Sequence, residues 1–340
     1  MFKKTTMILV LVMVFAFSSM MLLAEAKVSE VRLAGITMTS DTYMLGVGWS
    51  NVLRKYAPDV SMTCLEKGGT TILLRGMVNK EWEIGFIGSP HLMAAKNGIL
   101  LFEQEKEYSK EKYYDPTRVL FAILSGHCNY VVRADSDIYS VTDFKGKKVH
   151  LGQAGGFGGI MTEAIFRGEG LDIDKGDYKG VYIPTGEAMD QLRDKVGIDD
   201  VLVWGGIPQA LITNLSSKIP LRLISITKEG FEKFQKDFIM GPYSLLKTMS
   251  PEEIKEAYQG GVINTEPVDV WTIPMMVVVD KDMDEELAYT LVKTFWEHLD
   301  EVKSVSTQLE VITLETALIG LSAPLHPGAL RYYKEIGAIK

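Results

Sequence analysis

Short apolar runs alternate along the chain with longer stretches whose apolar residues recur at helical spacing. The first series has strand-like runs at 31–33, 60–65 and 84–87, separated by helical patterns over about 43–56 and 71–79. A second series repeats this order, with strand-like runs at 148–151, 180–183 and 201–204. Strands that alternate with helices are typical of α/β proteins with parallel strands. The pattern therefore predicts two α/β units.

Each predicted strand runs into a loop of small or polar residues. In the first unit these loops are 37–42, 67–70 and 88–90, and in the second unit they are 152–159 and 205–208. In open α/β sheets a ligand binds outside the carboxyl ends of the strands, where such loops lie. These loops are therefore the predicted binding elements.

Two extended apolar segments indicate how the units are joined. Residues 129–135 and 275–281 are both apolar runs followed by an acidic turn, and we interpret them as strands that cross between two domains. This assigns residues 27–129 and 276–340 to one lobe and residues 130–275 to the other. Two crossings form a hinge, a geometry that closes around small molecules. The predicted fold class is therefore α/β, with two lobes of mixed sheets joined by a two-strand hinge.

The first residues have the pattern of an export signal. Lys3 precedes an apolar run over 7–17, and Ala24-Glu25-Ala26 is a small-residue cleavage site, so residues 1–26 are the predicted signal peptide. The alternative is an uncleaved anchor, because residues 5–24 are about long enough to cross a bilayer when tilted. The Ala-x-Ala ending favours cleavage, and we expect the mature protein in the periplasm.

The charge of the chain excludes two classes of partner. The whole chain carries a formal net charge of −8. The signal contributes two lysines and one glutamate, so the mature chain is one unit more negative, at −9. Nucleic acids and anionic membrane surfaces are bound through clustered Lys and Arg. Neither is predicted as a partner.

Cysteine and histidine content does not predict a metal site. Cys64 and Cys128 could form one disulfide in an oxidising compartment, but both fall in strand-like runs, which favours two buried thiols. No histidine has a second histidine or a cysteine three or four residues further on, as a metal site would need. The histidines are His91, His127, His150, His298 and His326.

Four motifs resemble the extracytoplasmic receptors of the TAXI class of TRAP transporters. The most specific is Pro324-Leu325-His326-Pro327-Gly328-Ala329-Leu330-Arg331-Tyr332-Tyr333, and the supporting matches are 67–70, 144–149 and 204–208. The likeness extends over nearly all of 31–337. It implies a periplasmic binding protein-like fold. It also implies a receptor that delivers a small organic solute, often an amino acid or carboxylate, to an ion-gradient-driven TRAP-type membrane permease.

Two loops depart from the pattern of that family. Its first loop commonly reads Gly-Gly-Thr-Tyr-Tyr-Pro-x-Gly, whereas this chain has Thr39-Ser40-Asp41-Thr42-Tyr43-Met44-Leu45-Gly46. Its third loop often contains Gln-Ser-Asp, and here stands Gly88-Ser89-Pro90-His91. Both changes fall where a ligand is expected, so the identity of the ligand does not follow from the resemblance.

The loops of the second unit offer backbone groups and aromatic walls to a ligand. Gly155, Gly156 and Gly158 have no side chain to block close approach, and the following helix presents unpaired N–H donors to an anion. Phe157 either covers an apolar part of the ligand or fills the loop. Trp204 either walls the pocket or fills the core. A dinucleotide cofactor is excluded, because this spacing does not give Gly-x-Gly-x-x-Gly, and no cofactor is predicted.

The loops of the first unit offer hydroxyl and carboxylate groups. Ser40 or Asp41 would cap the helix that begins near Tyr43. If Asp41 faces the cleft instead, it weakens a carboxylate site by like charge and receives a ligand ammonium or hydroxyl group. Tyr43, Thr70 and Ser89 could donate hydroxyl hydrogen bonds or act as caps and turns. The candidate ligand-binding residues are Thr39, Ser40, Asp41, Tyr43, Gly69, Thr70, Ser89, Gly155, Gly156, Phe157, Gly158, Trp204 and Gly206.

No catalytic constellation can be assembled from motifs. The chain lacks Gly-x-Ser-x-Gly, and Asp199-Asp200 fits an exposed turn. A receptor needs only donors and apolar walls on two lobes. We therefore predict a non-enzymatic, monomeric binding protein for a small-molecule solute, which closes about its hinge and contacts the membrane only through the permease. The alternatives are the binding protein of an ABC-type importer and an exported hydrolase on the same fold.

Overall fold

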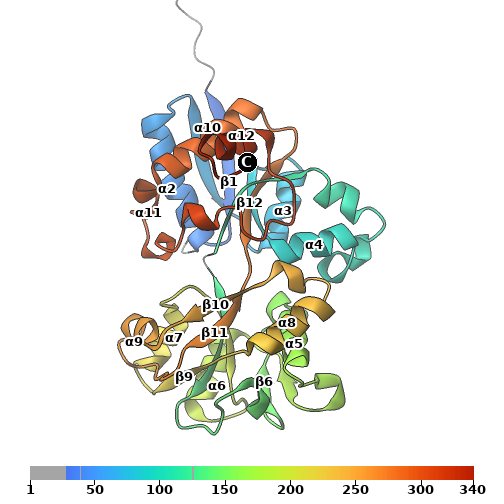
Figure 1. Cartoon of the computed structure of the whole chain (residues 1–340), viewed down its shortest axis with the longest axis vertical. Helices are drawn as coiled ribbons and strands as arrows, with labels where there is room; N and C mark the ends of the chain where they lie inside the picture. The colour runs from blue at the N-terminus through green and yellow to red at the C-terminus, as the bar shows by residue number, and fades with distance from the viewer. Residues whose placement is uncertain (1–27, 39, 125) are drawn as a thin grey trace, which may run out of the picture.

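The computed structural model of the protein describes residues 28–38, 40–124 and 126–340. The chain forms two lobes, one above the other in Figure 1, and each lobe has its own five-stranded sheet. The predicted α/β fold of two lobes is confirmed, and strands pair both in parallel and antiparallel within the sheet of the first lobe. The predicted signal peptide, residues 1–26, and the candidate site residue Thr39 lie outside the described residues.

The sheet of the first lobe has the order β2-β1-β3-β12-β4. Its strands are β1 (Ser29–Gly35), β2 (Val60–Glu66), β3 (Ile84–Gly88), β4 (Thr117–Ile123) and β12 (Met275–Asp280). β1 is parallel to β2 and β3, whereas β12 is antiparallel to its neighbours β3 and β4. The carboxyl ends of the three parallel strands therefore meet at one edge, which faces the second lobe (Figure 1).

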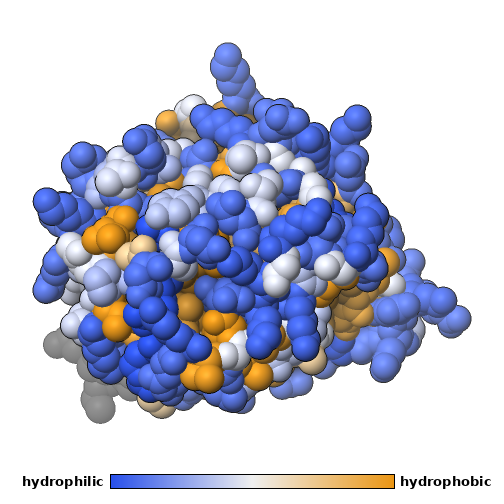
Figure 2. Space-filling model, turned by 90° about the horizontal axis from the view of Figure 1, so that it is seen from below, coloured by the Kyte–Doolittle hydropathy of each residue, from blue (hydrophilic) through white to orange (hydrophobic). Residues whose placement is uncertain are grey.

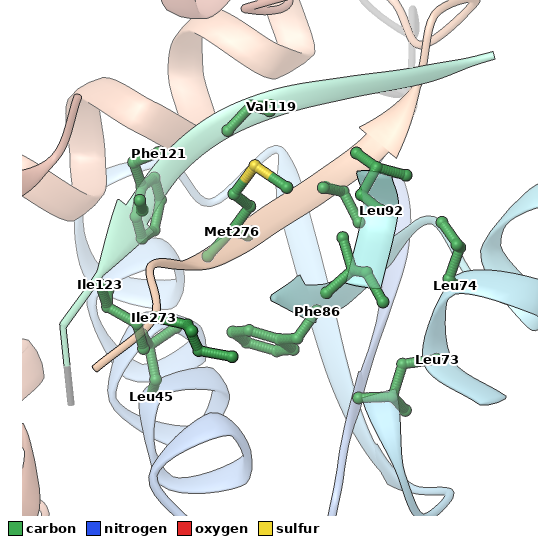
Figure 3. Packing of buried hydrophobic residues seen from close by; sticks show 14 of the residues in the cluster. Leu45, Leu73, Leu74, Phe86, Leu92, Val119, Phe121, Ile123, Ile273 and Met276 are labelled. Carbon is green, nitrogen blue, oxygen red and sulfur yellow. The ribbon is translucent and has the colours of Figure 1, made fainter. Parts of the chain in front are cut away.

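Apolar helices pack on this sheet. The buried Trp49 ring lies 5.5 Å from the ring of Phe121 and 5.1 Å from that of Phe295, and its Nε1 donates to the Leu291 carbonyl. Figure 3 shows part of the cluster, with side chains from helices and strands. The helices are α2 (Asp41–Tyr56), α3 (Thr70–Val78), α4 (Ser89–Asn97), α10 (Glu285–Glu297), α11 (Leu299–Lys303) and α12 (Pro327–Glu335), with the short turns η1 (Leu100–Glu105), η2 (Lys110–Tyr114), η6 (Thr307–Leu309) and η7 (Leu314–Thr316).

The motif that carries the strongest family resemblance holds α12 in place. His326 caps this helix, because its Nδ1 accepts from the Gly328 N–H, while its Nε2 donates to the Met283 carbonyl. A Cβ on Gly328 would lie 2.3 Å from the Glu285 carbonyl oxygen, so only glycine allows α12 to approach α10 this closely. Tyr333 donates to the Leu120 carbonyl of β4. The motif therefore serves packing within the first lobe, and none of its residues lines the cleft between the lobes.

Parallel pairing is limited in the second lobe. Its main sheet has the order β10-β11-β5-β8, with β9 paired to β5, and every pairing within it is antiparallel. Among the described strands of this lobe, only β6 and β7 pair in parallel. The strands are β5 (His127–Arg133), β6 (Lys148–His150), β7 (Lys179–Val181), β8 (Val201–Gly205), β9 (Leu221–Ile224), β10 (Leu245–Met249) and β11 (Val268–Thr272).

His150 joins the two sheets of the second lobe. Its Nε2 donates to the Ile183 carbonyl over 2.9 Å, and its Nδ1 accepts from the Leu202 N–H over 3.1 Å. Its backbone N–H donates to Oδ1 of Asp200 over 2.8 Å. Asp200 is 0 % exposed, so the expectation of an exposed turn at Asp199-Asp200 is corrected for the second of the two residues. The carboxyl group turns inward because it accepts the N–H at the end of β6.

Helices flank the sheets of the second lobe, and polar side chains cover much of its outer surface. Seen from below, hydrophilic side chains dominate this end of the molecule, with separate hydrophobic areas between them (Figure 2). No helix in the described part of the chain is long and apolar enough to cross a membrane. The helices are α5 (Phe157–Gly168), α6 (Thr185–Asp194), α7 (Ala210–Ser216), α8 (Lys228–Asp237) and α9 (Pro251–Ala257), with the turns η3 (Val141–Phe144), η4 (Ile173–Lys175) and η5 (Gly241–Tyr243).

The chain passes from the first lobe to the second between β4 and β5, and it returns at Ile273-Pro274, between β11 and β12. β5 pairs only in the second sheet and β12 only in the first, so neither strand is shared by the lobes as the sequence interpretation had it. The crossings are the short connections before these strands, a few residues from the predicted boundaries. Pro274 has no N–H to donate to a ladder, which ends β11 before β12 begins. The two sheets are therefore joined by short connections and not by strands that both lobes share.

The two cysteines lie in different lobes. Cys64 is on β2 and partly buried, Cys128 is on β5 and buried, and both are free thiols. Burial raises the pKa of the Cys64 thiol to about 11. Of the two alternatives left open by the sequence, the structure has unpaired thiols.

Candidate functional site

A cleft of about 580 Å³ lies between the lobes. The first lobe contributes the loop after β1 and the segment around η6, and the second lobe contributes the loop after β8. The crossing segments form its floor. The lining residues are Ile36, Thr37, Ser40, Asp41, Gly126, Trp204, Gly205, Gly206, Ile207, Pro208, Gln209, Ala210, Ile273, Met275, Thr307, Gln308 and Val311.

The loop of the first lobe is held by its own hydrogen bonds. Ser40 Oγ donates to the Thr37 carbonyl over 2.7 Å and accepts from the Tyr43 N–H over 3.3 Å, which makes Ser40 the cap of α2. The Ile36 N–H donates to Oγ1 of Thr42. A Cβ on Gly35 would lie 2.7 Å from the Tyr43 Cα, so glycine is required where the loop leaves β1.

Asp41 follows this cap in the first turn of α2. Its Oδ1 accepts from the Thr42 N–H over 2.7 Å, and the side chain is half-buried on the lining of the cleft. A carboxylate in the first turn of a helix is stabilised by the positive end of the helix dipole. The sequence left open whether Ser40 or Asp41 caps α2 and whether Asp41 faces the cleft. In the structure Ser40 is the cap, and Asp41 lies on the lining of the cleft.

The wall of the second lobe is built around Trp204. Its ring is 39 % exposed and packs against the buried ring of Trp271, with centroids 5.2 Å apart. A Cβ on Gly126 would lie 2.6 Å from Nε1 of Trp204, so the crossing segment fits closely against the indole. The loop that follows contains a cis bond between Ile207 and Pro208. One side of the indole is thus fixed, and the exposed remainder faces the cleft.

Gln209 closes that loop onto α7. Its Oε1 accepts from the N–H groups of Leu211 and Ile212, over 2.7 and 3.1 Å, which caps the helix. Its backbone N–H donates to the hydroxyl of Tyr258. These bonds hold the residues that follow Trp204 at the cleft without help from a ligand.

The lobes touch each other directly beside the cleft. His91 of α4 and Phe157 of α5 stack with ring centroids 3.6 Å apart and an interplanar angle of 25°. Burial lowers the pKa of His91 to about 3, so the imidazole is neutral. Sequence reasoning offered two roles for Phe157, a ligand cover or a loop filler. The structure shows a third, contact with the opposite lobe.

The structure brings four of the predicted site residues into the lining: Ser40, Asp41, Trp204 and Gly206. The others among the described residues lie outside it. Gly69 is the exposed N-cap position of α3, Thr70 begins that helix, and Tyr43 is half-buried on α2. Gly155, Gly156, Phe157 and Gly158 form the loop and first turn of α5.

Ser89 does not face the cleft. It is 0 % exposed, and its Oγ donates to the Gly320 carbonyl over 2.6 Å. Its backbone N–H donates to the Pro274 carbonyl at the hinge, and its own carbonyl accepts from Ser322 Oγ. The hydroxyl is therefore used to join α4 to a distant loop, and it is not available as a ligand donor.

The glycines before and within α5 serve different purposes. Gly155 has φ +73°, in the left-handed region that favours glycine. A Cβ on Gly159 would lie 2.4 Å from the Leu151 carbonyl oxygen, so this glycine lets the helix pack against the strand before it. A Cβ on Gly158 would meet only the end of the Leu202 side chain, at 3.3 Å. Packing therefore explains Gly159 and leaves Gly158 unexplained.

Sequence reasoning missed the segment around η6. Thr307, Gln308 and Val311 line the cleft, although no motif marks them. They come from the part of the chain after α11, which is placed against α2 only by the folding of the first lobe. Met275 was assigned to a crossing strand and not to the lining, and Ile273 was not singled out. None of these residues follows one of the predicted parallel strands. The rule that a ligand binds at the carboxyl ends of such strands therefore could not identify them.

Two α/β lobes, two crossings and a cleft lined from both lobes define the fold of the periplasmic solute-binding proteins. Residues 33–337 match the NMT1-like family, so the chain belongs to that family.

Solved structures of this fold are similar over most of their length. A TctC solute-binding protein from Polaromonas has 14 % sequence identity and a TM-score of 0.50, with 92 % of this chain and 99 % of that chain covered. A TRAP periplasmic solute-binding protein from Rhodobacter sphaeroides has 13 % identity and a TM-score of 0.49, with 91 % and 93 % covered. The periplasmic aliphatic sulphonate binding protein from Escherichia coli has 14 % identity and a TM-score of 0.45, with 92 % and 94 % covered. At these identities the likeness concerns the fold alone.

Proposed function

We propose that the protein is the periplasmic receptor of a TAXI-type TRAP transporter, exported by a cleavable signal peptide. It captures a small organic solute between its lobes and delivers it to an ion-gradient-driven membrane permease. The observation that carries this proposal is the cleft, whose lining comes from both lobes and from both crossing segments. The closing motif at 324–333 supports the TAXI class over an ABC-type importer, because the resemblance is strongest there.

The mechanism is hinge closure. A ligand that contacts Asp41 in one lobe and Trp204 in the other binds the closed form better than the open form, and shifts the equilibrium by that difference. A shift from 1:99 to 99:1 requires about 5.5 kcal/mol of differential binding. The permease then recognises the closed form.

The loop from Gly155 to Gly158 belongs to the same proposal as the part of the site that closure completes. Phe157, in this loop, already reaches the other lobe at His91. The N-cap of α5, Gly156, makes no side-chain cap bond, and no acidic residue stands in the first turn. The N–H groups of that turn are thus open to a polar ligand group.

The proposal is tested on the mature protein, beginning at Lys27, with a library of small solutes. A tight ligand at 100 times its Kd stabilises the protein by about 2.7 kcal/mol, which a thermal-shift assay detects. X-ray scattering with that ligand should show a smaller radius of gyration, and mass spectrometry should recover the ligand unchanged. Conversion of the ligand above the background rate contradicts a receptor and favours the hydrolase alternative.

A further inference from the structure

Trp204 differs from the other tryptophans of the chain in its exposure to solvent. The sequence contains five tryptophans, and all five lie in the described part of the chain. Trp204 is 39 % exposed, whereas the other four are at most 7 % exposed: Trp49, Trp82, Trp271 and Trp296. Trp204 is also the one aromatic residue among the described residues that line the cleft. The cleft therefore has a single open aromatic surface.

The indole of Trp204 is held in place by groups within the protein. Trp271 packs against it with ring centroids 5.2 Å apart and an interplanar angle of 59°. Trp271 is itself fully buried, and its Nε1 donates to the hydroxyl of Tyr130 over 3.1 Å. The backbone of Gly126 comes so close that a Cβ there would lie 2.6 Å from Nε1 of Trp204. A side chain that is already fixed loses little conformational entropy when a ligand packs on it.

Aliphatic side chains line the same cleft from the other lobe and from the segment that returns to it. Ile36 lies in the loop after β1, Val311 follows η6, and Met275 begins β12. Hinge closure moves the first-lobe side chains and Trp204 toward each other. A flat ring between an indole and an aliphatic surface buries both of its faces at once.

Stacking distinguishes an aromatic ring from a saturated ring of the same size. The faces and edges of aromatic rings carry opposite partial charges, so a pair of such rings gains more than the burial of its area alone. The gain corresponds to about twofold to tenfold in Kd. A purely aliphatic site would favour the saturated ring, since that ring has the larger apolar surface. A preference for the aromatic ring is therefore a property that Trp204 would give to the site.

We propose, resting on the receptor function above, that the ligand is a small solute with an aromatic ring, and that this ring packs on the exposed part of Trp204. The other face of the ring contacts Ile36 and Met275 in the closed form. Because the two surfaces come from different lobes, the ring binds the closed form better than the open form and shifts the equilibrium toward closure.

The test uses pairs of solutes that have the same charge and the same number of carbon atoms but differ in the ring. Phenylacetate is paired with cyclohexylacetate, benzylamine with cyclohexylmethylamine, and benzyl alcohol with cyclohexylmethanol. Calorimetry on the mature protein gives the Kd of each solute. We expect an aromatic member to bind about twofold to tenfold more tightly than its saturated partner. Because the pairs include anions, cations and neutral solutes, the charge of the ligand does not decide the outcome.

Tryptophan fluorescence locates the bound ring. Acrylamide quenches exposed indoles, so in this protein it reports mainly on Trp204. The aromatic solute that binds best should lower the quenching constant, because it covers this indole. In Trp204→Phe the remaining tryptophans are buried, and the same solute should leave their quenching unchanged.

Two substitutions at Trp204 separate stacking from apolar burial. Trp204→Leu keeps an apolar side chain without a ring, so the preference for the aromatic member of each pair should disappear. Trp204→Phe keeps a ring and should retain part of the preference. Tyr108→Leu removes an aromatic ring that is 49 % exposed and lies outside the cleft lining, and it should leave the Kd values of the pair unchanged. Urea unfolding shows whether each variant is folded.

The outcomes separate this proposal from the receptor function. If the saturated solutes bind as tightly as the aromatic ones, or if only solutes without a ring stabilise the protein, the aromatic ligand is overturned and the receptor stands. A preference that persists in Trp204→Leu, or a quenching constant that does not change on binding, also overturns it. A library in which no solute stabilises the protein counts against both proposals. If Trp204→Leu does not fold, the pairs and the quenching of the wild type decide.

Discussion

Asp200 is a carboxyl group buried in the second lobe without a cation. Its Oδ1 accepts the His150 N–H, and its Oδ2 has no hydrogen-bond partner in the described structure. Burial raises the pKa of this group well above its usual range. The side chain is therefore protonated in the folded protein over a pH range in which the unfolded chain releases the proton.

Asp200→Asn should change how stability depends on pH. The folded pKa of Asp200 lies above the unfolded value of about 3.9, so the wild type is stabilised at low pH and loses that contribution as pH rises through the folded pKa. Asparagine keeps the shape and has no proton to lose. The advantage of the variant should grow by about 1.4 kcal/mol for each pH unit above pH 4, until the folded pKa is reached.

Urea unfolding of both proteins at several values between pH 4.5 and 8 measures this difference. Asp237→Asn, an exposed residue at the end of α8, is the matched control and should show no such trend. A constant difference between wild type and Asp200→Asn across the range would show that the carboxyl group has the same pKa in both states.

Single residues were predictable where the cause is local. Ser40 caps the helix that it precedes, and Trp204 stands at the end of the strand that predicted it. Ser89 looked equally suited to a ligand, but its hydroxyl is taken by the Gly320 carbonyl, 231 residues further along the chain. Asp200 was expected to be exposed because the bond that draws it inward comes from His150. A hydrogen bond to a residue far away in the chain cannot be predicted from the residues next to the donor or acceptor.

At the level of elements, the alternation of strands and helices predicted the first lobe well. The runs at 31–33, 60–65 and 84–87 fall within β1, β2 and β3. In the second lobe the strands were found but not their pairing, because β5 enters from the first lobe and runs antiparallel to the strands on both of its edges. The segment at 307–311 was missed for the same reason, since its position depends on packing and not on its own pattern.

The first turn of α5 separates a packing glycine from a candidate binding glycine. Gly158→Val should leave the protein folded, because its Cβ meets only the flexible end of Leu202, and should weaken ligand binding by filling the approach to the helix N-terminus. Gly159→Ala should lower the stability of the protein and leave its affinity for the ligand unchanged. Its Cβ would meet the Leu151 carbonyl, which cannot move aside, and the protein should lose about 1–3 kcal/mol of stability.

Calorimetric titration and urea unfolding of both variants, with the ligand found by screening, make the comparison. Unchanged affinity in a well-folded Gly158→Val protein would remove the loop from the site. The two variants differ by one position on the same helix, so a general weakening of α5 cannot produce opposite results.

At the scale of the whole molecule, the contact between the lobes at His91 and Phe157 should make the proposed closure depend on pH. Burial lowers the pKa of His91 to about 3, whereas an imidazole exposed by opening returns toward about 6.5. Below about pH 6.5, His91 therefore binds a proton in the open form but not in the closed form. Acid should open the lobes, at about 1.4 kcal/mol for each pH unit below that value.

X-ray scattering of the ligand-free protein between pH 7.5 and 5 should show the radius of gyration increasing as the pH falls. His91→Phe keeps a ring against Phe157 but cannot be protonated, so its radius should stay constant over the same range. His150 and His326 are held by bonds within a single lobe, and both are retained in the variant. An equal response to acid in His91→Phe would assign the opening to another group and leave the His91–Phe157 contact without a role in it.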